Sequence, residues 1–394
     1  MTSFNIDANK SIYVRVEDGF AEEYNPLNPV QQIKFENDGF KYESVTELLE
    51  IVYMNDERKL DADISAGRIT GKLDASKNLD KSCLATAVNK ALIEAGLGEL
   101  EEKSNTTTIS SVSTVSGVTT LTVASGSGFA SGDFIQVVKS GNKTSIYKIK
   151  TVSLDDFVLE YPVTDDDLLV MVATADVNNQ TKCKVARPKD TVTFQFIIVD
   201  NDGKVEVMKG ASLAIKEDHP VDKQGKHMYN IMSASVAYKD ANKVRYTKPT
   251  NITLEGQYNP IKFNFQVAVV KDPATGLYVT AMPVLNEINV EHTVNPGTHV
   301  GGVNNITGWY TEPSIKGELM FDNNAINLEL FGPDASALTD NAFFLSQKDY
   351  AFEADGVKFV TKDRGAINDK YSTISVVANV NHRTDKEPVI ILPQ

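Results

Sequence analysis

The sequence has little of what most catalytic and metal sites are built from. Its 394 residues include only 2 cysteines, 5 histidines and 1 tryptophan. Two cysteines cannot form a disulfide framework in a chain of this length, so we expect Cys83 and Cys183 to be reduced and structural. The histidines form no HExxH pair, and no serine lies in a GxSxG turn. We therefore expect no enzymatic activity, no cofactor and no metal ion.

Long apolar runs are also missing. No stretch approaches the roughly 18 consecutive apolar residues that span a bilayer, and the first residues lack the basic and apolar segments of a signal peptide. We expect synthesis in the cytoplasm and no membrane insertion. Acidic residues outnumber basic ones by 53 to 39, for a formal net charge of −14. This balance argues against gripping nucleic acid through its phosphates.

Several polar clusters resemble binding motifs but fit turns or surface positions better. The DNDG segment at 200–203 has its glycine in the fourth position, where a calcium loop needs it in the sixth, and predicts a hairpin turn. SGNKT at 140–144 lacks the first glycine of a P-loop and also predicts a turn. We expect the acidic runs at 155–156 and 165–167 to be solvated. His219 and His227 lie in a polar, loop-like stretch and are expected at the surface.

Short runs rich in Val, Ile, Thr and aromatic residues alternate with turn residues, which predicts a mainly β fold. The clearest predicted strands are 11–17, 119–123, 134–138, 145–152, 191–199, 263–270 and 373–380. Tight turns are expected at 37–39, 200–203 and 355–356, because Asn, Asp and Gly accept positive φ at low cost.

One segment breaks the β pattern. Over 80–95, Leu84, Val88, Ala91, Leu92 and Ala95 recur at helical intervals, which predicts an amphipathic helix with Gly96 as its C′ residue. The STVE segment at 44–47 fits a capping box that opens a short helix through residue 53. The β-branched pair at 51–52 favours a strand there instead.

The composition changes to Thr, Ser, Val and Gly between about 103 and 182. Short strands follow one another there at the spacing of a small sandwich or barrel. We therefore expect 104–182 to be an inserted small β module, with 1–103 and 183–394 forming the first and second parts of the main domain.

A short phrase occurs twice in the chain. RITGKLD at 68–74 returns as SIKGELM at 314–320, each followed by a polar stretch and an apolar segment, which favours two related halves. In order, a charged stretch at 55–68 leads into the first Gly-x-Leu phrase, the helix and the inserted module follow, and residues 286–295 lead to SIKGELMFD at 314–322. This series resembles the tail tube proteins of long-tailed bacteriophages.

The resemblance implies a β-sandwich or half-barrel whose inner sheet joins those of neighbouring copies into a closed ring. Such rings usually contain six chains and stack, with other tail proteins, into the hollow tail of the virion, through which DNA passes into the host. If each phrase marks a complete tube domain, three chains would form the ring. An acidic bore would repel the phosphates of the passing DNA.

Two expectations follow for surfaces. The charged stretch contains our candidates for contacts between successive rings, which are Arg58, Lys59, Asp61 and Arg68. We expect the inserted module to project outward, because an insertion of this size fits a surface loop but not a narrow bore, and its removal to leave assembly intact. The alternative is a tail-tip, distal tail or capsid-decorating protein that uses the module to bind a surface.

Overall fold

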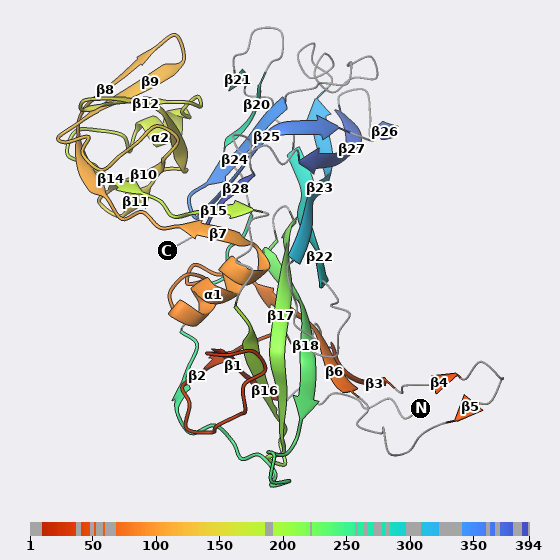
Figure 1. Cartoon of the computed structure of the whole chain (residues 1–394). Helices are drawn as coiled ribbons and strands as arrows, with labels where there is room; N and C mark the ends of the chain where they lie inside the picture. Colours follow the sequence, from red (N-terminus) through yellow and green to blue (C-terminus); the bar gives the residue numbers. More distant parts are fainter. Residues whose placement is uncertain are drawn as a thin grey trace.

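The computed structural model describes residues 10–36, 41–47, 51–52, 58–59, 68–185, 192–220, 223–256, 259–263, 267–271, 278–279, 284–296, 309–322, 341–359, 363–366, 371–380 and 388–392. The chain is mainly β, as predicted (Figure 1). Its strands form a 19-stranded sheet, which we call the body, and a separate seven-stranded sheet, six strands of which close into a barrel. Among the described strands, β4 (Ile51–Val52) and β5 (Arg58–Lys59) pair only with each other. No helix in the described residues is both long and apolar enough to span a bilayer.

The longest strands of the body lie side by side in the antiparallel order β3-β6-β18-β17-β22-β23-β27. Their bounds are β3 (Lys41–Glu47), β6 (Arg68–Asn78), β17 (Val205–Pro220), β18 (Lys226–Ala237), β22 (Val284–Pro296), β23 (Trp309–Asp322) and β27 (Tyr371–Val380). β17 connects these strands, because β18 pairs with it along most of its length, whereas β16 pairs with its first half and β22 with its last residues.

Shorter strands extend this sheet at two places. At β16, the order continues through β1 and β2 to β19, with β1 (Ser11–Val16), β2 (Val30–Ile33), β16 (Phe194–Val199) and β19 (Ile252–Thr253). At the other end of the sheet, β27 pairs with both β26 and β25. Two series of strands then start from β25: one runs through β24 and β20 to β21, and the other through β28 and β15 to β7. These are β7 (Gly98–Glu101), β15 (Lys182–Val185), β20 (Val267–Lys271), β21 (Tyr278–Val279), β24 (Asn341–Gln347), β25 (Tyr350–Phe359), β26 (Asp363–Ala366) and β28 (Val389–Ile391).

β16 is buried on both faces, which explains its uninterrupted apolar sequence. Phe194, Phe196 and Ile198 join the main core of the body, which also contains the apolar face of α1 (Ala87–Gly96). Ile197, on the opposite face, belongs to a smaller cluster in which the Tyr24 and Tyr246 rings meet edge to face. The strand predicted at 191–199 is confirmed over 194–199.

The predicted helix exists but begins later than its apolar spacing indicates. α1 starts at the N-cap Thr86, whose Oγ1 accepts the Asn89 N–H at 3.1 Å. Residues 81–86 form turns and bends instead, because the Asp80 carboxylate accepts the Ser82 N–H and bends the chain.

The helix also ends differently from the prediction. Gly96 is its last helical residue, and Leu97 is the C-cap. A Cβ at Gly96 would lie 2.5 Å from Leu213 Cδ1 and 2.6 Å from Ile215 Cγ1. Glycine is present because the helix packs closely on β17, so the C′ prediction is wrong.

Two other local predictions are overridden by strand pairing. The described residues of 44–53 form strands: 44–47 belongs to β3, paired with β6 throughout, and 51–52 is β4, as the β-branched pair favours. Asp355 and Gly356 form no turn but lie within β25. The register shifts between the Asn341–Val357 and Phe343–Ala354 pairs. Asp355 and Gly356 therefore lie opposite a single residue of β24 and form a β-bulge. The turn expected at 37–39 lies outside the described residues, and the turn at 200–203 is confirmed, with Gly203 at φ +79°.

The barrel is built entirely from residues 106–179, inside the stretch expected to form a small β module. Its closed order is β10-β12-β13-β9-β8-β14 and back to β10, all antiparallel. The strands are β8 (Thr106–Val115), β9 (Val118–Val123), β10 (Phe134–Lys139), β12 (Tyr147–Ser153), β13 (Asp156–Leu159) and β14 (Asp176–Asn179). β11 (Asn142–Lys143) extends β10 as a hairpin at the predicted 140–144 turn, and α2 (Asp165–Leu168) is a single turn of helix.

The barrel is joined to the body by packing as well as by the chain. Its core includes Phe344 of β24 and Ala351 of β25, both fully buried, and Ile391 of β28. In Figure 1 it lies to one side of the body, beside these strands. The barrel therefore shares a hydrophobic core with the strands on which it sits.

Candidate functional site

Two of the four residues expected to contact a neighbouring ring, Arg58 and Lys59, lie outside the body sheet. Arg58 and Lys59 form β5, and Arg68 begins β6, whereas Asp61 lies outside the described residues. In Figure 1, β4 and β5 lie well away from the long strands, past the ends of β3 and β6. The backbone thus places Arg58 and Lys59 on a two-stranded arm that extends from the body.

β3 forms the border of the sheet next to this arm. It pairs with β6 over its full length, from Lys41 opposite Asp74 to Glu47 opposite Arg68. Among the described strands, none pairs with its other side. A border strand of this length offers a row of backbone N–H and C=O groups to another strand.

Both copies of the repeated phrase lie in a long strand with an antiparallel neighbour on each side. The first lies in β6, between β3 and β18, and the second in β23, between β22 and β27. At Gly71 of the first copy, an added Cβ would lie 2.7 Å from Val236 Cγ2 and 2.8 Å from Ser233 Oγ. The glycine is therefore needed for packing against β18. The common origin of the two halves stays a prediction.

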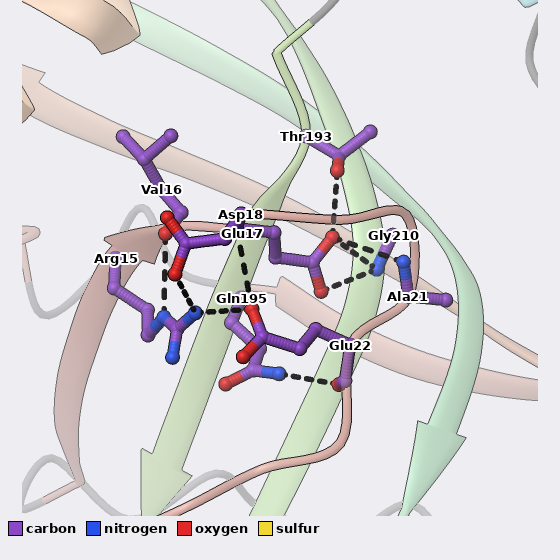
Figure 2. A network of polar contacts seen from close by, with 9 residues as sticks. All are labelled: Arg15, Val16, Glu17, Asp18, Ala21, Glu22, Thr193, Gln195 and Gly210. Carbon is purple, nitrogen blue, oxygen red and sulfur yellow. Dashed lines mark hydrogen bonds and ion pairs between the residues drawn. The ribbon is translucent and has the colours of Figure 1, made fainter. Parts of the chain in front are cut away.

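A buried carboxylate completes the pairing of β16 and β17 (Figure 2). The β16–β17 register shifts so that Lys209 and Gly210 oppose Gln195 alone, and Gly210 adopts φ +59° in this bulge. Glu17 accepts the Gly210 N–H at 3.0 Å and the Thr193 hydroxyl at 2.7 Å. Burial raises the pKa of Glu17, although these hydrogen bonds oppose the rise. The carboxylate thus satisfies an amide that the bulge displaces from the ladder.

The neighbouring charges hold the turn that follows β1. Arg15, itself buried, forms an ion pair with Glu22 and lies 3.7 Å from Asp18. Gln195 Nε2 donates to the Glu22 carbonyl oxygen at 2.7 Å. As Figure 2 shows, these side chains converge on one turn. Their interactions are internal to the fold, and the arrangement stabilises structure.

The main core contains a second polar cluster, which links β17, β18 and β25. The Glu217 carboxylate lies 2.9 Å from His219 Nε2, 2.6 Å from His227 Nε2 and 2.6 Å from the Tyr350 hydroxyl. An ionised carboxylate only accepts hydrogen bonds, so each of these three atoms carries a proton toward it. Burial acts to raise the pKa of Glu217, but the hydrogen bonds from the two histidines outweigh it and the pKa lies well below its usual range.

The expected surface positions of His219 and His227 are therefore wrong. They are 1% and 3% exposed, because His219 lies in the last residues of β17 and His227 in the first residues of β18, where the two strands enter the core. A signal was present in the sequence: Leu213, Ile215, Glu217 and His219 alternate on one face of a strand. Solvent does not reach Glu217, so the cluster offers no reactive group to a substrate and serves to fix three strands.

Both cysteines lie in the same core and are free thiols. Burial raises the pKa of Cys83 and of Cys183, and the charge of Glu217 adds to both shifts. A thiol that resists ionisation is a poor nucleophile and a poor metal ligand. Within the described residues, no three His, Cys, Asp or Glu side chains gather as metal ligands.

The acidic runs in the barrel are partly internal. Asp167 is 3% exposed and accepts the Tyr147 hydroxyl at 2.6 Å and the Ser145 N–H at 3.2 Å, so its expected solvation is wrong. Asp155 accepts the Gly126 N–H at 2.9 Å, and Asp156 accepts the Thr122 hydroxyl at 2.7 Å. These carboxylates hold the loops of the barrel.

No protein-family model matches the chain, and no curated protein matches it significantly. The likeness to tail tube proteins therefore depends on the quoted residues and on their arrangement alone. The polar clusters at Glu17 and Glu217 stabilise the fold. By contrast, one side of β3 has no partner among the described strands, and the β4–β5 arm lies away from the long strands. The candidate functional surface is thus the border of the sheet.

Proposed function

We propose that this chain is the structural subunit of a bacteriophage tail tube, which assembles into stacked rings around a central bore. The proposal is supported by the residue patterns that resemble such proteins and by the mainly β body. Both Gly-x-Leu phrases lie in comparable central strands of this body. The proposed location is the tail of the virion, and the proposed partners are further copies of the chain, other tail proteins and, transiently, DNA.

The open border at β3 is the observation that carries the proposal. The pairings of the body form an open series, with β3 at one end. When a neighbouring copy adds a strand to such a border, its free backbone groups become paired, and repetition around an axis closes a ring without leaving borders. In this proposal, the β4–β5 arm next to β3 contacts a further copy, in the same ring or the next.

The electrostatic balance supports the same function. A net charge of −14 repels the DNA phosphates, so that DNA would move along an acidic bore without adhering to it. A bore whose surface is net positive in an assembled tube would refute this part of the proposal.

Electron microscopy of the purified chain, at increasing concentration, tests the function. We expect long hollow tubes with a regular axial repeat. A ring of six chains would exclude two tube domains per chain, whereas three chains with pseudo-sixfold symmetry would require them. A chain that stays monomeric at high concentration, with β3 covered by its own residues, would overturn the proposal.

The barrel favours one alternative function. A closed barrel with its own core, docked on a larger body, suits a tail-tip or capsid-decorating protein that binds a surface. The same micrographs separate the two, because discrete rings indicate a tail-tip protein and single particles indicate a decorating one.

A further inference from the structure

A polar cleft lies where the barrel meets the body. It has a volume of about 470 Å³ and is open to solvent. The body contributes Lys81, from the turn before α1, and Lys348 and Asp349, from the turn between β24 and β25. The barrel contributes β10, β11, β14 and the start of β8; its lining residues include Asn105, Gln136, Lys143, Asn178, Asn179 and Gln180.

The cleft is cationic in a strongly acidic protein. Lys81, Lys143 and Lys348 line it, and all three are exposed, whereas Asp349 is its single lining carboxylate among the described residues. Lys81 Nζ lies 2.6 Å from the Asp349 carboxylate, so this pair is neutral. The side chains of Lys143 and Lys348 form no ion pair or hydrogen bond with any described residue. Two positive charges thus remain available to an anion.

Amide side chains line the same cleft and are held in place. Thr106 Oγ1 donates to Asn178 Oδ1 at 3.0 Å, which leaves the Asn178 amide NH₂ free of partners among the described residues. Gln180 Nε2 donates to the Asn178 carbonyl oxygen at 3.1 Å, and β14 is paired on both sides, with β8 and β10. Gln136 Nε2 donates to the Thr144 carbonyl oxygen at 2.7 Å and also to that of Lys348, so it fixes the lysine-bearing turn to the barrel.

The lysine and amide side chains of the cleft favour a ligand that carries both a negative charge and hydroxyl groups. Fixed amides donate to and accept from hydroxyl groups, and ammonium groups bind phosphate as point charges. Val138 and Ile146 are its apolar lining residues, and of the described lining residues none is aromatic. A neutral sugar ring would therefore find no stacking surface. The volume lies within the range of small-molecule sites.

We propose that this cleft binds a phosphorylated carbohydrate, with its phosphate between Lys143 and Lys348 and its hydroxyls on the amides around Asn178. Such a site needs both the barrel and the body, because each contributes one of the two available charges. It does not depend on whether the chain assembles into tubes.

Isothermal titration calorimetry with the full chain at low ionic strength tests the site, with glucose 6-phosphate, inorganic phosphate and glucose as probes. We expect glucose 6-phosphate to bind, inorganic phosphate to bind at least about fivefold more weakly and glucose not to bind at the same concentrations. The double variant Lys143→Gln with Lys348→Gln should weaken glucose 6-phosphate binding by about tenfold or more, and Asn178→Asp should weaken it too.

The matched control is Lys150→Gln, which removes an exposed charge from the same barrel outside the cleft. It should leave binding unchanged, and the substituted lysines are exposed, so all lysine variants should melt like the wild type. Three results would overturn the proposal: no binding of glucose 6-phosphate, equal binding of inorganic phosphate, or a loss with Lys150→Gln as large as that of the double variant.

Discussion

The rings of Tyr161 and Phe344 stack face to face, with centroids 3.9 Å apart and 6° between their planes. Tyr161 belongs to the barrel and Phe344 to β24, and both are fully buried. The Tyr161 hydroxyl also donates to Glu353 of β25, whose carboxylate lies 2.7 Å from Lys148 Nζ of the barrel. Apolar stacking and a buried charge pair thus fix the barrel to the body.

This contact predicts that Phe344→Ala destabilises the whole chain. Removing a buried ring at a shared core costs about 3–5 kcal/mol, measured as the free energy of unfolding in urea. Leu154→Ala is the control, because Leu154 is 91% exposed and its loss should cost less than about 0.5 kcal/mol. Equal stability of the two variants would show that the barrel is attached by its connecting chain alone.

The same contact changes how the module should be deleted. Removal of 104–182 uncovers Phe344, Ala351 and Ile391, which now belong to the barrel core. A deletion that tests assembly therefore needs polar residues at Phe344 and Ile391. With these, we still expect assembly to continue without the module, and its loss in a folded deletion variant would contradict the outward position.

Glu217→Gln should lower stability by about 3–5 kcal/mol at neutral pH, because it removes the charge that two imidazoles and a phenol surround. The folded pKa of Glu217 lies below its ordinary value of 4.5. Its ionisation therefore stabilises the fold above that pH, and this contribution is lost as the pH falls. The difference between wild type and variant should shrink below about pH 4.5 in urea unfolding series.

Tyr350→Phe is the matched control for this pH dependence. It removes one hydrogen bond to Glu217 but leaves the carboxylate in place. We expect a smaller loss, about 1–3 kcal/mol, and a pH dependence below 4.5 like that of the wild type. A difference between wild type and Glu217→Gln that stays constant down to pH 3.5 would exclude the role of Glu217 ionisation.

Gly71→Ala tests why the repeated phrase contains glycine. The added methyl meets Val236 and Ser233 within 2.8 Å, so we expect a loss of about 1–3 kcal/mol by thermal or urea unfolding. At Gly19 nothing lies within 4 Å of an added Cβ, and Gly19→Ala should be neutral within about 0.5 kcal/mol. Similar effects of both substitutions would mean that the sheet accommodates a side chain at Gly71.

Prolines in β3 test assembly through its border. Successive backbone N–H groups of a strand point to opposite sides. Of the variants Ser44→Pro and Val45→Pro, one therefore removes an N–H that points toward β6, and the other removes an N–H on the open side of β3. We expect one variant to fold as the wild type does and yet to form no tubes in electron micrographs. Normal tubes from both variants would rule out strand addition at β3.

Arg58→Glu tests the arm. If Arg58 contacts a neighbouring copy, reversing its charge should shorten the tubes or lower their melting temperature, and the effect should depend on salt. Lys150→Glu makes the same charge change on an exposed barrel position and should leave tube length unchanged. Equal tube lengths for wild type and Arg58→Glu would remove Arg58 from the contact.

Local patterns predicted several elements of the fold, including the strands around 194–199 and 371–380 and the helix that ends near Gly96. They failed where pairing between distant strands decides the outcome. The capping signal at Ser44 was overridden by pairing with β6, and Asp355 and Gly356 form a bulge because β24 opposes them.

The buried clusters were harder to predict than the strands. Glu217 and His227 belong to different strands and meet Tyr350, which is far away in the chain. Polar composition around His219 indicated a loop, although its alternation with Leu213 and Ile215 indicated a strand. Charged residues are buried here because they pair with one another, and composition alone does not carry that information.

Closure of the barrel limits how it can take part in any polymer. Each of its six ring-forming strands already has a neighbour on both sides, so none is left to template another chain. Growth by backbone pairing would have to pass through the larger sheet, and the barrel would travel with each added copy as a pendant group. The spacing between successive pendants, and so between successive clefts, would then be set by the repeat of the sheet that carries them.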